Sequence, residues 1–215
     1  MNIPKGLIVS CQVESKSAFT DRDVVKFSIE SSKGGCVGLR IRGVKNVSMV
    51  KDKVNLPIIG LTKSLYKNDD VYITPTAEDG IKLFDNGADY IAMDATGRNG
   101  YKELNKLSLQ NIPVIGDISN ISQAYKAIDN GCVALTTALS GYTSECCTSD
   151  NPDYKLLEEL INKFSNIPIL AEGRYWERNQ IKKAFDLGSH NVVIGTAITR
   201  PHLITKRLME VYNEK

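Results

Sequence analysis

Eight short runs of apolar, β-branched residues recur along the 215-residue chain. Each run is continuously apolar rather than alternating, which is typical of a parallel strand covered on both faces. Between the runs lie amphipathic stretches with helical spacing, such as "SQAYKAIDNG" and "YKLLEELINKF". The eight runs occupy residues 6–12, 36–41, 56–63, 89–96, 112–119, 132–140, 167–174 and 191–198.

This alternation of strands and helices predicts an α/β fold. Eight β–α units in a chain of this length predict a (β/α)8 barrel of the TIM-barrel type, with a doubly wound open sheet as the alternative. A further short strand, "VYITPT" (71–76), is expected between the third strand and its helix. No linker or low-complexity segment divides the chain, so residues 1–215 are expected to form one catalytic domain.

Composition excludes several classes of function. With 27 basic and 25 acidic residues the net charge is +2, and no basic stripe is present, so we expect no nucleic-acid partner. No apolar run approaches the roughly 20 residues of a membrane span, and no signal peptide is recognisable. Five cysteines without a C-x-x-C pair fit free thiols in the cytoplasm, and two histidines are too few for a histidine-rich metal centre.

Polar side chains gather where the predicted strands end. The C-terminal ends of barrel strands meet at one mouth, where the active site of such a barrel lies, whereas the opposite strand ends here carry mainly Pro, Gly and Cys. In chain order the polar strand ends are Ser10 and Gln12, Arg40, Lys63, Asp94, Asp117, Thr136 and Thr137, Glu172 and Arg174, and Gly195 and Thr196.

Lys63 and Glu172 are the strongest catalytic candidates. A lysine in a water-poor pocket has a lowered pKa and becomes a usable base or acid near neutral pH. With a carboxylate such as Glu172 across the barrel, it is able to move a proton at a carbon. Two alternatives stay open on spacing alone: a structural ion pair of Lys63 with Asp94 or Glu172, and a Schiff base as in an aldolase.

The last two β–α units indicate a phosphate site. Gly173 and Gly195 follow the seventh and eighth strands, where backbone N–H groups are able to cradle a phosphate together with Thr196. Arg200 adds a positive charge just before Pro201. Ordinary turn glycines and a solvated arginine are the alternative. We expect no metal, because lysine and arginine at the mouth neutralise Asp94 and Asp117.

Three other features are interpreted as structural. Arg98, with Tyr101 and Lys102, is expected to lie in a solvated loop, and an accessory patch at the site is the alternative. Cys11 is expected to be a buried strand cysteine, because no histidine lies near it in the sequence. Trp176 is expected to be a packing residue.

Taken in order, the motifs resemble the N-acylglucosamine-6-phosphate 2-epimerase family, also called N-acetylmannosamine-6-phosphate 2-epimerase. The resemblance runs from residue 6 to about residue 208. The motifs that carry it are "GLIVSCQ", "GLR", "LPIIGLTK", "YITPT", "AMDAT", "DIS", "SGYT", "AEGR" and "AITRP…ITKR".

The resemblance implies a (β/α)8 barrel that interconverts N-acetylmannosamine 6-phosphate and N-acetylglucosamine 6-phosphate in bacterial sialic-acid catabolism. It implies no cofactor and no metal, and it favours a homodimer; the expected cytoplasmic location comes from the free thiols and the lack of a signal peptide. Lys63 matches the family's catalytic lysine and Glu172 its catalytic glutamate. Arg40 and Asp94 match further motif residues, Arg200 is placed on the phosphate, and Gln12 and Tyr142 line the sugar pocket.

Three segments depart from the family pattern. After "SCQ" the family carries a loop of the type "ALPDEPLHSS", whereas this chain reads "VESKSAFTD". After the fourth strand the usual basic, proline-containing stretch is shortened to "GRNG". The paired glycines before "AITRP" are Gly195 and Thr196 here, although the threonine still offers a backbone N–H and adds a hydroxyl.

The implied chemistry sets roles for these residues. The C2 hydrogen of the sugar is acidic only beside the C1 aldehyde of the opened ring, so Lys63 and Glu172 are expected to handle the proton at C2. Lys63 and Arg40 would stabilise the enolate, and Asp94 would orient the lysine or bind a sugar hydroxyl. A lysine-dependent phosphosugar aldolase or decarboxylase and a non-catalytic sugar-phosphate binder are the alternative functions.

Overall fold

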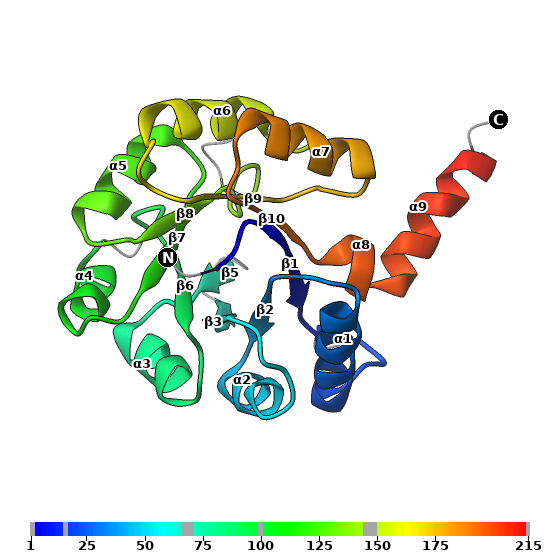
Figure 1. The fold of residues 1–215 in the computed structure, drawn as a ribbon, viewed down its shortest axis with the longest axis horizontal. Coiled ribbons are helices and arrows are strands. Elements are labelled where there is room, and N and C mark those ends of the chain that lie inside the picture. Colours follow the sequence, from blue (N-terminus) through cyan, green and yellow to red (C-terminus); the bar gives the residue numbers. More distant parts are fainter. Residues whose placement is uncertain (1–2, 15–16, 66–70, 99–100, 144–149, 214–215) are drawn as a thin grey trace.

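The eight apolar runs form the staves of one closed barrel in the computed structural model, which describes residues 3–14, 17–65, 71–98, 101–143 and 150–213 (Figure 1). Neighbouring strands pair in parallel, in the order β1-β10-β9-β8-β7-β6-β3-β2, and β2 pairs back with β1. The predicted (β/α)8 barrel is therefore confirmed over an open sheet. The staves are β1 (Gly6–Cys11), β2 (Gly38–Arg42), β3 (Ile58–Leu61), β6 (Tyr90–Asp94), β7 (Val114–Asp117), β8 (Ala134–Thr136), β9 (Ile169–Glu172) and β10 (Asn191–Ile194).

Helices surround the staves, and several of them begin at a polar residue that caps the first turn. The Thr76 hydroxyl accepts the N–H of Asp79 at 3.1 Å, and the Asn120 side chain accepts that of Gln123 at 3.0 Å, which satisfies N–H groups that the first helical turn leaves unpaired. The helices are α1 (Asp21–Lys33), α2 (Val44–Lys51), α3 (Ala77–Asp85), α4 (Lys102–Leu109), α5 (Ile121–Asp129), α6 (Tyr154–Lys163), α7 (Arg178–Leu187), α8 (Thr196–Thr199) and α9 (Pro201–Asn213). No helix in the described part of the chain is long and apolar enough to cross a membrane.

Successive residues of each stave serve two different cores, as a strand covered on both faces requires. On β1, Ile8 points into the barrel, where it packs with Ile59 and Leu170, while Val9 belongs to the cluster between strands and helices. This explains why the runs are continuously apolar: both faces of every stave are buried.

Prolines mark the starts of three staves, as predicted. Pro57, Pro113 and Pro168 each precede a strand, and each carbonyl accepts an N–H from the neighbouring stave, at 2.9, 2.9 and 3.1 Å. A proline is tolerated there because only its carbonyl takes part in the ladder.

The boundary of the third stave differs from the prediction. β3 ends at Leu61, and Lys63 begins a separate strand, β4 (Lys63–Leu65), which pairs antiparallel with β5 (Val71–Ile73). The predicted extra strand therefore exists, and it forms a small two-stranded sheet with the residues that follow β3. Lys63 thus lies at the base of this sheet rather than on a barrel stave.

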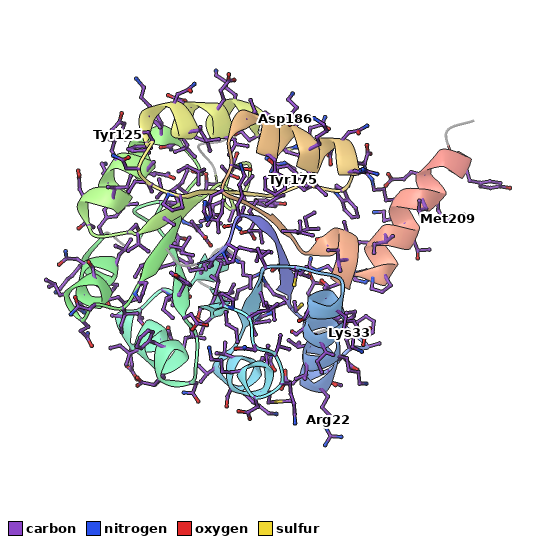
Figure 2. All side chains as sticks on the ribbon, viewed as in Figure 1. Arg22, Lys33, Tyr125, Tyr175, Asp186 and Met209 are labelled. Atoms are coloured by element: carbon purple, nitrogen blue, oxygen red, sulfur yellow. The ribbon has the colours of Figure 1, made fainter. Side chains whose placement is uncertain are left out.

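The C-terminal helix extends away from the barrel. α9 follows the short α8 and leaves the ring of helices, and Met209 lies on its outer part (Figures 1 and 2). Leu208, Met209 and Tyr212 are 70%, 51% and 67% exposed, so the outer turns of α9 carry apolar side chains without burying them.

Candidate active site

A polar layer lies directly above the apolar interior of the barrel. Every second residue of a stave faces inward. Asp117 therefore faces the same way as the buried Ile115 two residues before it, and Glu172 the same way as Leu170. The same spacing places Ser10, Arg40, Asp94 and Thr136 on the inward face. The alternation within the strands thus collects polar groups at the C-terminal mouth, as expected.

The mouth contains a cavity of about 490 Å³. Nine of the ten site residues predicted from the sequence line it, and Asp94 does not. The nine are Gln12, Arg40, Lys63, Tyr142, Glu172, Gly173, Gly195, Thr196 and Arg200, and the wall also includes Ser10, Ile73, Asp117, Arg174, Tyr175 and Trp176.

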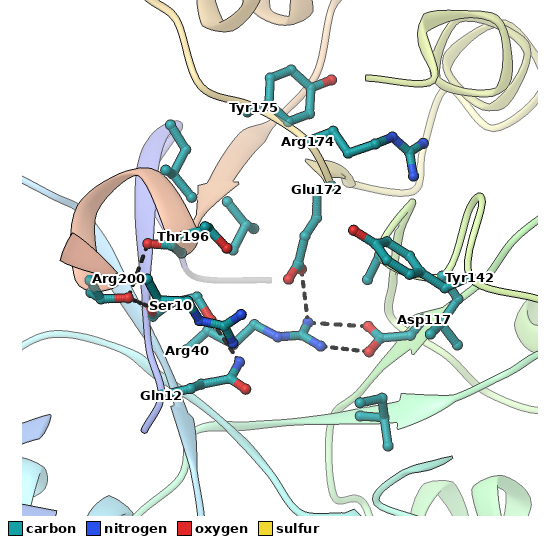
Figure 3. Close-up of a pocket in the computed structure, with 18 of the residues that line it drawn as sticks. Ser10, Gln12, Arg40, Asp117, Tyr142, Glu172, Arg174, Tyr175, Thr196 and Arg200 are labelled. Atoms are coloured by element: carbon teal, nitrogen blue, oxygen red, sulfur yellow. Dashed lines mark hydrogen bonds and ion pairs between the residues drawn. The ribbon is translucent and has the colours of Figure 1, made fainter. Parts of the chain in front are cut away.

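An ion network crosses the floor of this cavity (Figure 3). Arg40 binds Asp117 through two hydrogen bonds of 3.1 and 2.5 Å, and its Nη1 lies 3.1 Å from Oε2 of Glu172. Burial alone would lower the pKa of Arg40, but the carboxylates of Asp117 and Glu172 more than offset this and raise it, so Arg40 keeps its charge. Burial raises the pKa of Asp117, and Arg40 opposes that rise.

Glu172 has the titration behaviour of a proton-transfer group. Burial raises its pKa to about 7; Arg40 opposes this rise and the Asp117 carboxylate adds to it. Its backbone is fixed, because the Thr137 hydroxyl accepts the N–H of Glu172 at 2.9 Å and donates to its carbonyl at 2.8 Å. Gly173 then turns the chain at φ 105°, which a residue with a side chain rarely adopts.

Lys63 faces the same cavity from the small sheet. Burial lowers its pKa to about 8, and three neighbouring cations lower it further, while Glu172 raises it. The cations are Arg40, Arg200 and Arg42, and Asp117 is a second carboxylate close enough to interact with Lys63. The ion pair of Lys63 with Asp94 or Glu172 that spacing left open is not among the salt bridges of the described residues.

Gln12 and Tyr142 lie at the sides of the cavity. The Gln12 amide donates to the Ser10 hydroxyl at 2.8 Å, which holds the side chain across the end of β1. Tyr142 is 61% exposed, and the Arg174 guanidinium lies 5.6 Å from the centre of its ring. Arg174 is itself anchored, donating to the carbonyls of Ser140 and Asn151 at 2.7 and 2.8 Å.

The residues predicted to bind phosphate also come together at the mouth. Gly195 packs closely on β1, because a Cβ atom added to it would lie 3.2 Å from the Cβ of Ser10. Arg200 reaches the cavity and pairs with Glu14, with Nη1 and Oε1 2.7 Å apart. Glu14 belongs to the segment after β1 that departs from the family pattern.

Asp94 makes different contacts. It accepts hydrogen bonds from the N–H and the hydroxyl of Thr96, at 2.9 and 2.6 Å, and pairs with Arg98. Arg98 is therefore tied to the end of β6 and is not the solvated side chain expected from the sequence. Cys11 is buried as expected, and Trp176 combines the expected packing, against Arg207, with a place in the cavity wall.

Two buried polar atoms of the cavity, Gln12 Oε1 and Arg40 Nε, lack a hydrogen-bond partner among the described residues, and Glu172 Oε2 has the ion pair with Arg40 but no hydrogen bond of good geometry. Buried polar groups are normally paired, so such atoms call for a polar ligand. No cluster of three or more His, Cys, Asp or Glu side chains suited to a metal ion occurs in the described part of the chain.

Sequence reasoning left Asp117 out of the substrate and catalytic residues. The sequence did contain a signal for Asp117. It ends the apolar run "VIGD" two residues after an isoleucine that faces inward, so its carboxylate must also face the barrel interior. Ile73 and Tyr175 gave no such signal, because their place in the wall depends on how loops fold back over the mouth.

Comparisons with known proteins agree on one family. The family model described as "Putative N-acetylmannosamine-6-phosphate epimerase" matches residues 24–214. Two relatives with the name "Putative N-acetylmannosamine-6-phosphate 2-epimerase" come from Clostridioides difficile and Caldanaerobacter subterraneus subsp. tengcongensis. They are 39% and 38% identical to this chain, over 95% and 99% of it and 94% and 93% of their own lengths.

A solved structure is similar over almost the whole fold. The N-acetylmannosamine-6-phosphate 2-epimerase from Clostridium perfringens superposes with a TM-score of 0.91 at 34% identity, over 98% of this chain and 95% of that one. With a family model over most of its length and relatives well above 30% identity, the chain belongs to the N-acetylmannosamine-6-phosphate epimerase family.

Proposed function

We propose that this protein interconverts N-acetylmannosamine 6-phosphate and N-acetylglucosamine 6-phosphate by moving the proton on C2 of the ring-opened sugar. One observation carries the proposal: Lys63 and Glu172 face one cavity with pKa values of about 8 and about 7. Proton transfer is most effective when the pKa of the group lies near the working pH. Family membership supports the same reaction.

The chemistry needs a proton taken from one face of C2 and one returned to the other. Lys63 and Glu172 reach the cavity from different elements, β4 and β9, which suits a pair that acts on a planar intermediate from two directions. Opening the ring exposes the C1 aldehyde, and loss of the C2 proton places negative charge on its oxygen. Arg40 and the ammonium form of Lys63 supply positive charge for that enolate.

The remaining wall residues bind the substrate. Gln12 Oε1 and Arg40 Nε are unpaired among the described residues and offer an acceptor and a donor to the sugar. Arg200, with the backbone at Gly173, Gly195 and Thr196, binds the 6-phosphate. Contacts this far from C2 contribute binding energy that helps to orient the reacting carbon.

The direct test is exchange of the C2 hydrogen in deuterated water, followed by proton NMR on N-acetylmannosamine 6-phosphate. The wild-type protein should exchange that hydrogen and form the glucosamine epimer. Lys63→Ala and Glu172→Ala should each abolish exchange while circular dichroism stays unchanged. Near-normal exchange in either variant would remove that residue from the mechanism, and a Lys63 adduct trapped by borohydride would indicate an aldolase.

We propose that two copies of the chain form a homodimer and that residues 1–215 of each copy form one catalytic domain. We further propose that the protein acts in amino-sugar breakdown in the cytoplasm. The exposed Leu208 and Met209 of the extended α9 support a contact with a second copy, since exposed apolar side chains grouped on one element mark interaction sites. Buried free thiols at Cys11, Cys36 and Cys132 fit a reducing compartment. In sedimentation, Leu208→Glu/Met209→Glu should shift the protein to monomer; an unchanged dimer would rule out this surface.

A further inference from the structure

The small sheet that carries Lys63 has two distinct faces. Lys63 pairs with Ile73 across the sheet, and Ser64 pairs with Tyr72. Directly paired residues of antiparallel strands share a face, and successive residues alternate between faces. Lys63 and Ile73 line the cavity, so Tyr72 lies on the face that is turned away from it.

Two hydrogen bonds close the base of this sheet, and Ile73 packs in the barrel core beside Ile59. The N–H of Thr74 donates to the Thr62 carbonyl at 3.0 Å, and the N–H of Thr62 donates to the Thr74 hydroxyl at 3.1 Å. Thr74 is fully buried and has a φ of 43°. These contacts fix the backbone just before Lys63, but they do not restrain the outer face of the sheet.

Arg98 holds that outer face. Its guanidinium carbon lies 4.3 Å from the centre of the Tyr72 ring, a distance typical of a cation–π contact. The same guanidinium pairs with the Asp94 carboxylate, and its Nε donates to the Thr96 hydroxyl at 3.0 Å. Asp94 ends β6, so the Arg98 side chain connects the outer face of the sheet to the barrel wall.

We propose that Arg98 is a positioning residue for Lys63, with Asp94 and Tyr72 as the two ends of the brace. The inference rests on the proposed role of Lys63. A two-stranded sheet is marginally stable by itself, and here the base and the brace together hold it against the mouth. Asp94 therefore serves catalysis through Arg98, without itself touching the sugar.

The physical consequence concerns both the place and the solvation of the amine. Proton transfer requires the amine within about 0.5 Å of its productive position, and the lysine side chain is long and flexible. If the sheet loosens, Lys63 becomes more hydrated, and the burial that holds its pKa near 8 is reduced. Its pKa then rises toward the ordinary value of 10.5.

Two variants test the brace from its two ends. Arg98→Met removes the cation, and Tyr72→Leu removes the ring without changing any charge and leaves the Arg98–Asp94 pair in place. Each should lower kcat about tenfold or more, with KM for N-acetylmannosamine 6-phosphate within about twofold, because the amine is misplaced while the binding wall is kept. Lys102→Met, an exposed charge removal on the neighbouring helix, should leave both parameters unchanged.

The pKa of Lys63 supplies a measurement that lost stability alone would not move. It is read from the pH dependence of Lys63 acylation by acetic anhydride, followed by peptide mass spectrometry, and requires no activity. The brace predicts a higher Lys63 pKa in both variants, measured at a temperature at which circular dichroism shows each variant to be fully folded. If Arg98→Met does not fold, Tyr72→Leu decides alone, because its charges are those of the wild type.

A folded variant in which neither kcat nor the Lys63 pKa changes would overturn the proposal. A rise in KM with an unchanged Lys63 pKa would also overturn it, because Arg98 would then act on the substrate directly. The proposed function fails in a different way, since active Lys63→Ala would dismiss Lys63 as a catalytic group. The acylation result would still show whether Arg98 and Tyr72 hold the lysine.

Discussion

Arg40 and Asp117, 77 positions apart in the chain, meet on the floor of the cavity with Nη2 and Oδ2 2.5 Å apart. Their side chains are 2% and 0% exposed. Neither charge has water to solvate it, so each depends on the other. The pair therefore links the stability of the barrel to the electrostatics of the site.

The first prediction concerns this pair. Arg40→Met should lower the free energy of unfolding by about 3–5 kcal/mol, because it leaves a buried carboxylate without its cation. Arg40→Met/Asp117→Leu should recover part of the loss, since both charges are then removed. Urea unfolding measures the difference, with Lys182→Ala as a control that breaks the exposed Lys182–Asp186 pair and should change little. A loss no larger than that of the control would contradict the idea of an interdependent pair.

The second prediction concerns pH. Glu172 has a raised pKa of about 7 and Lys63 a lowered pKa of about 8, so the fraction of molecules with a single proton on the pair is largest between these values. The rate should therefore rise with pH through about 7 and fall above about 8, whichever group holds the proton. Initial rates measured from pH 5.5 to 10 test this. A rate that stays constant across this range would show that the two groups do not control the reaction.

Asp117→Asn refines the pH test, since the Asp117 carboxylate raises the pKa of Glu172. Removing that negative charge should lower the pKa of Glu172 and move the acid limb to lower pH. The alkaline limb should move less, because the cations that lower the pKa of Lys63 all remain. An acid limb that stays in place would assign it to another group.

The third prediction concerns Glu14, which pairs with Arg200 at 2.7 Å. If Arg200 binds the 6-phosphate, the carboxylate competes with the substrate, so Glu14→Gln should lower KM by about two- to fivefold with kcat unchanged. Arg200→Ala should raise KM instead. The lower KM of Glu14→Gln should also depend more steeply on salt concentration than the wild-type KM. An unchanged KM would mean that Glu14 does not compete with the phosphate for Arg200.

The fourth prediction compares two glycines of neighbouring staves. A Cβ atom at Gly60 would lie 2.8 Å from the Cβ of Ala88, which has no flexible end to move aside, whereas at Gly38 the nearest atoms would be at 3.4 Å. Gly60→Ala should therefore destabilise the protein by about 1–3 kcal/mol, and Gly38→Ala by clearly less. Thermal unfolding of the two variants side by side measures this, and equal losses would contradict the packing argument.

The sequence by itself determined which segments are the barrel strands and which polar residues end them. It also determined that these residues collect at one mouth of the barrel. The reason is local: continuous apolar runs identify strands buried on both faces, and a two-residue period places Arg40, Asp117 and Glu172 on the inward side. The ordered motifs also identified the family, which the family model and the relatives confirm.

Only the tertiary structure decided which groups pair. Lys63 lies on a small antiparallel sheet because β3 ends two residues earlier, a boundary set by pairing with Val71–Ile73. Asp94 faces Arg98 and Arg200 faces Glu14, although spacing permitted other partners. Glu14 and Arg200 come from separate loops, whose mutual position depends on the closed barrel beneath them. Asp94 and Arg98 are only four residues apart, but which way the Arg98 side chain turns is settled by Tyr72 of the small sheet.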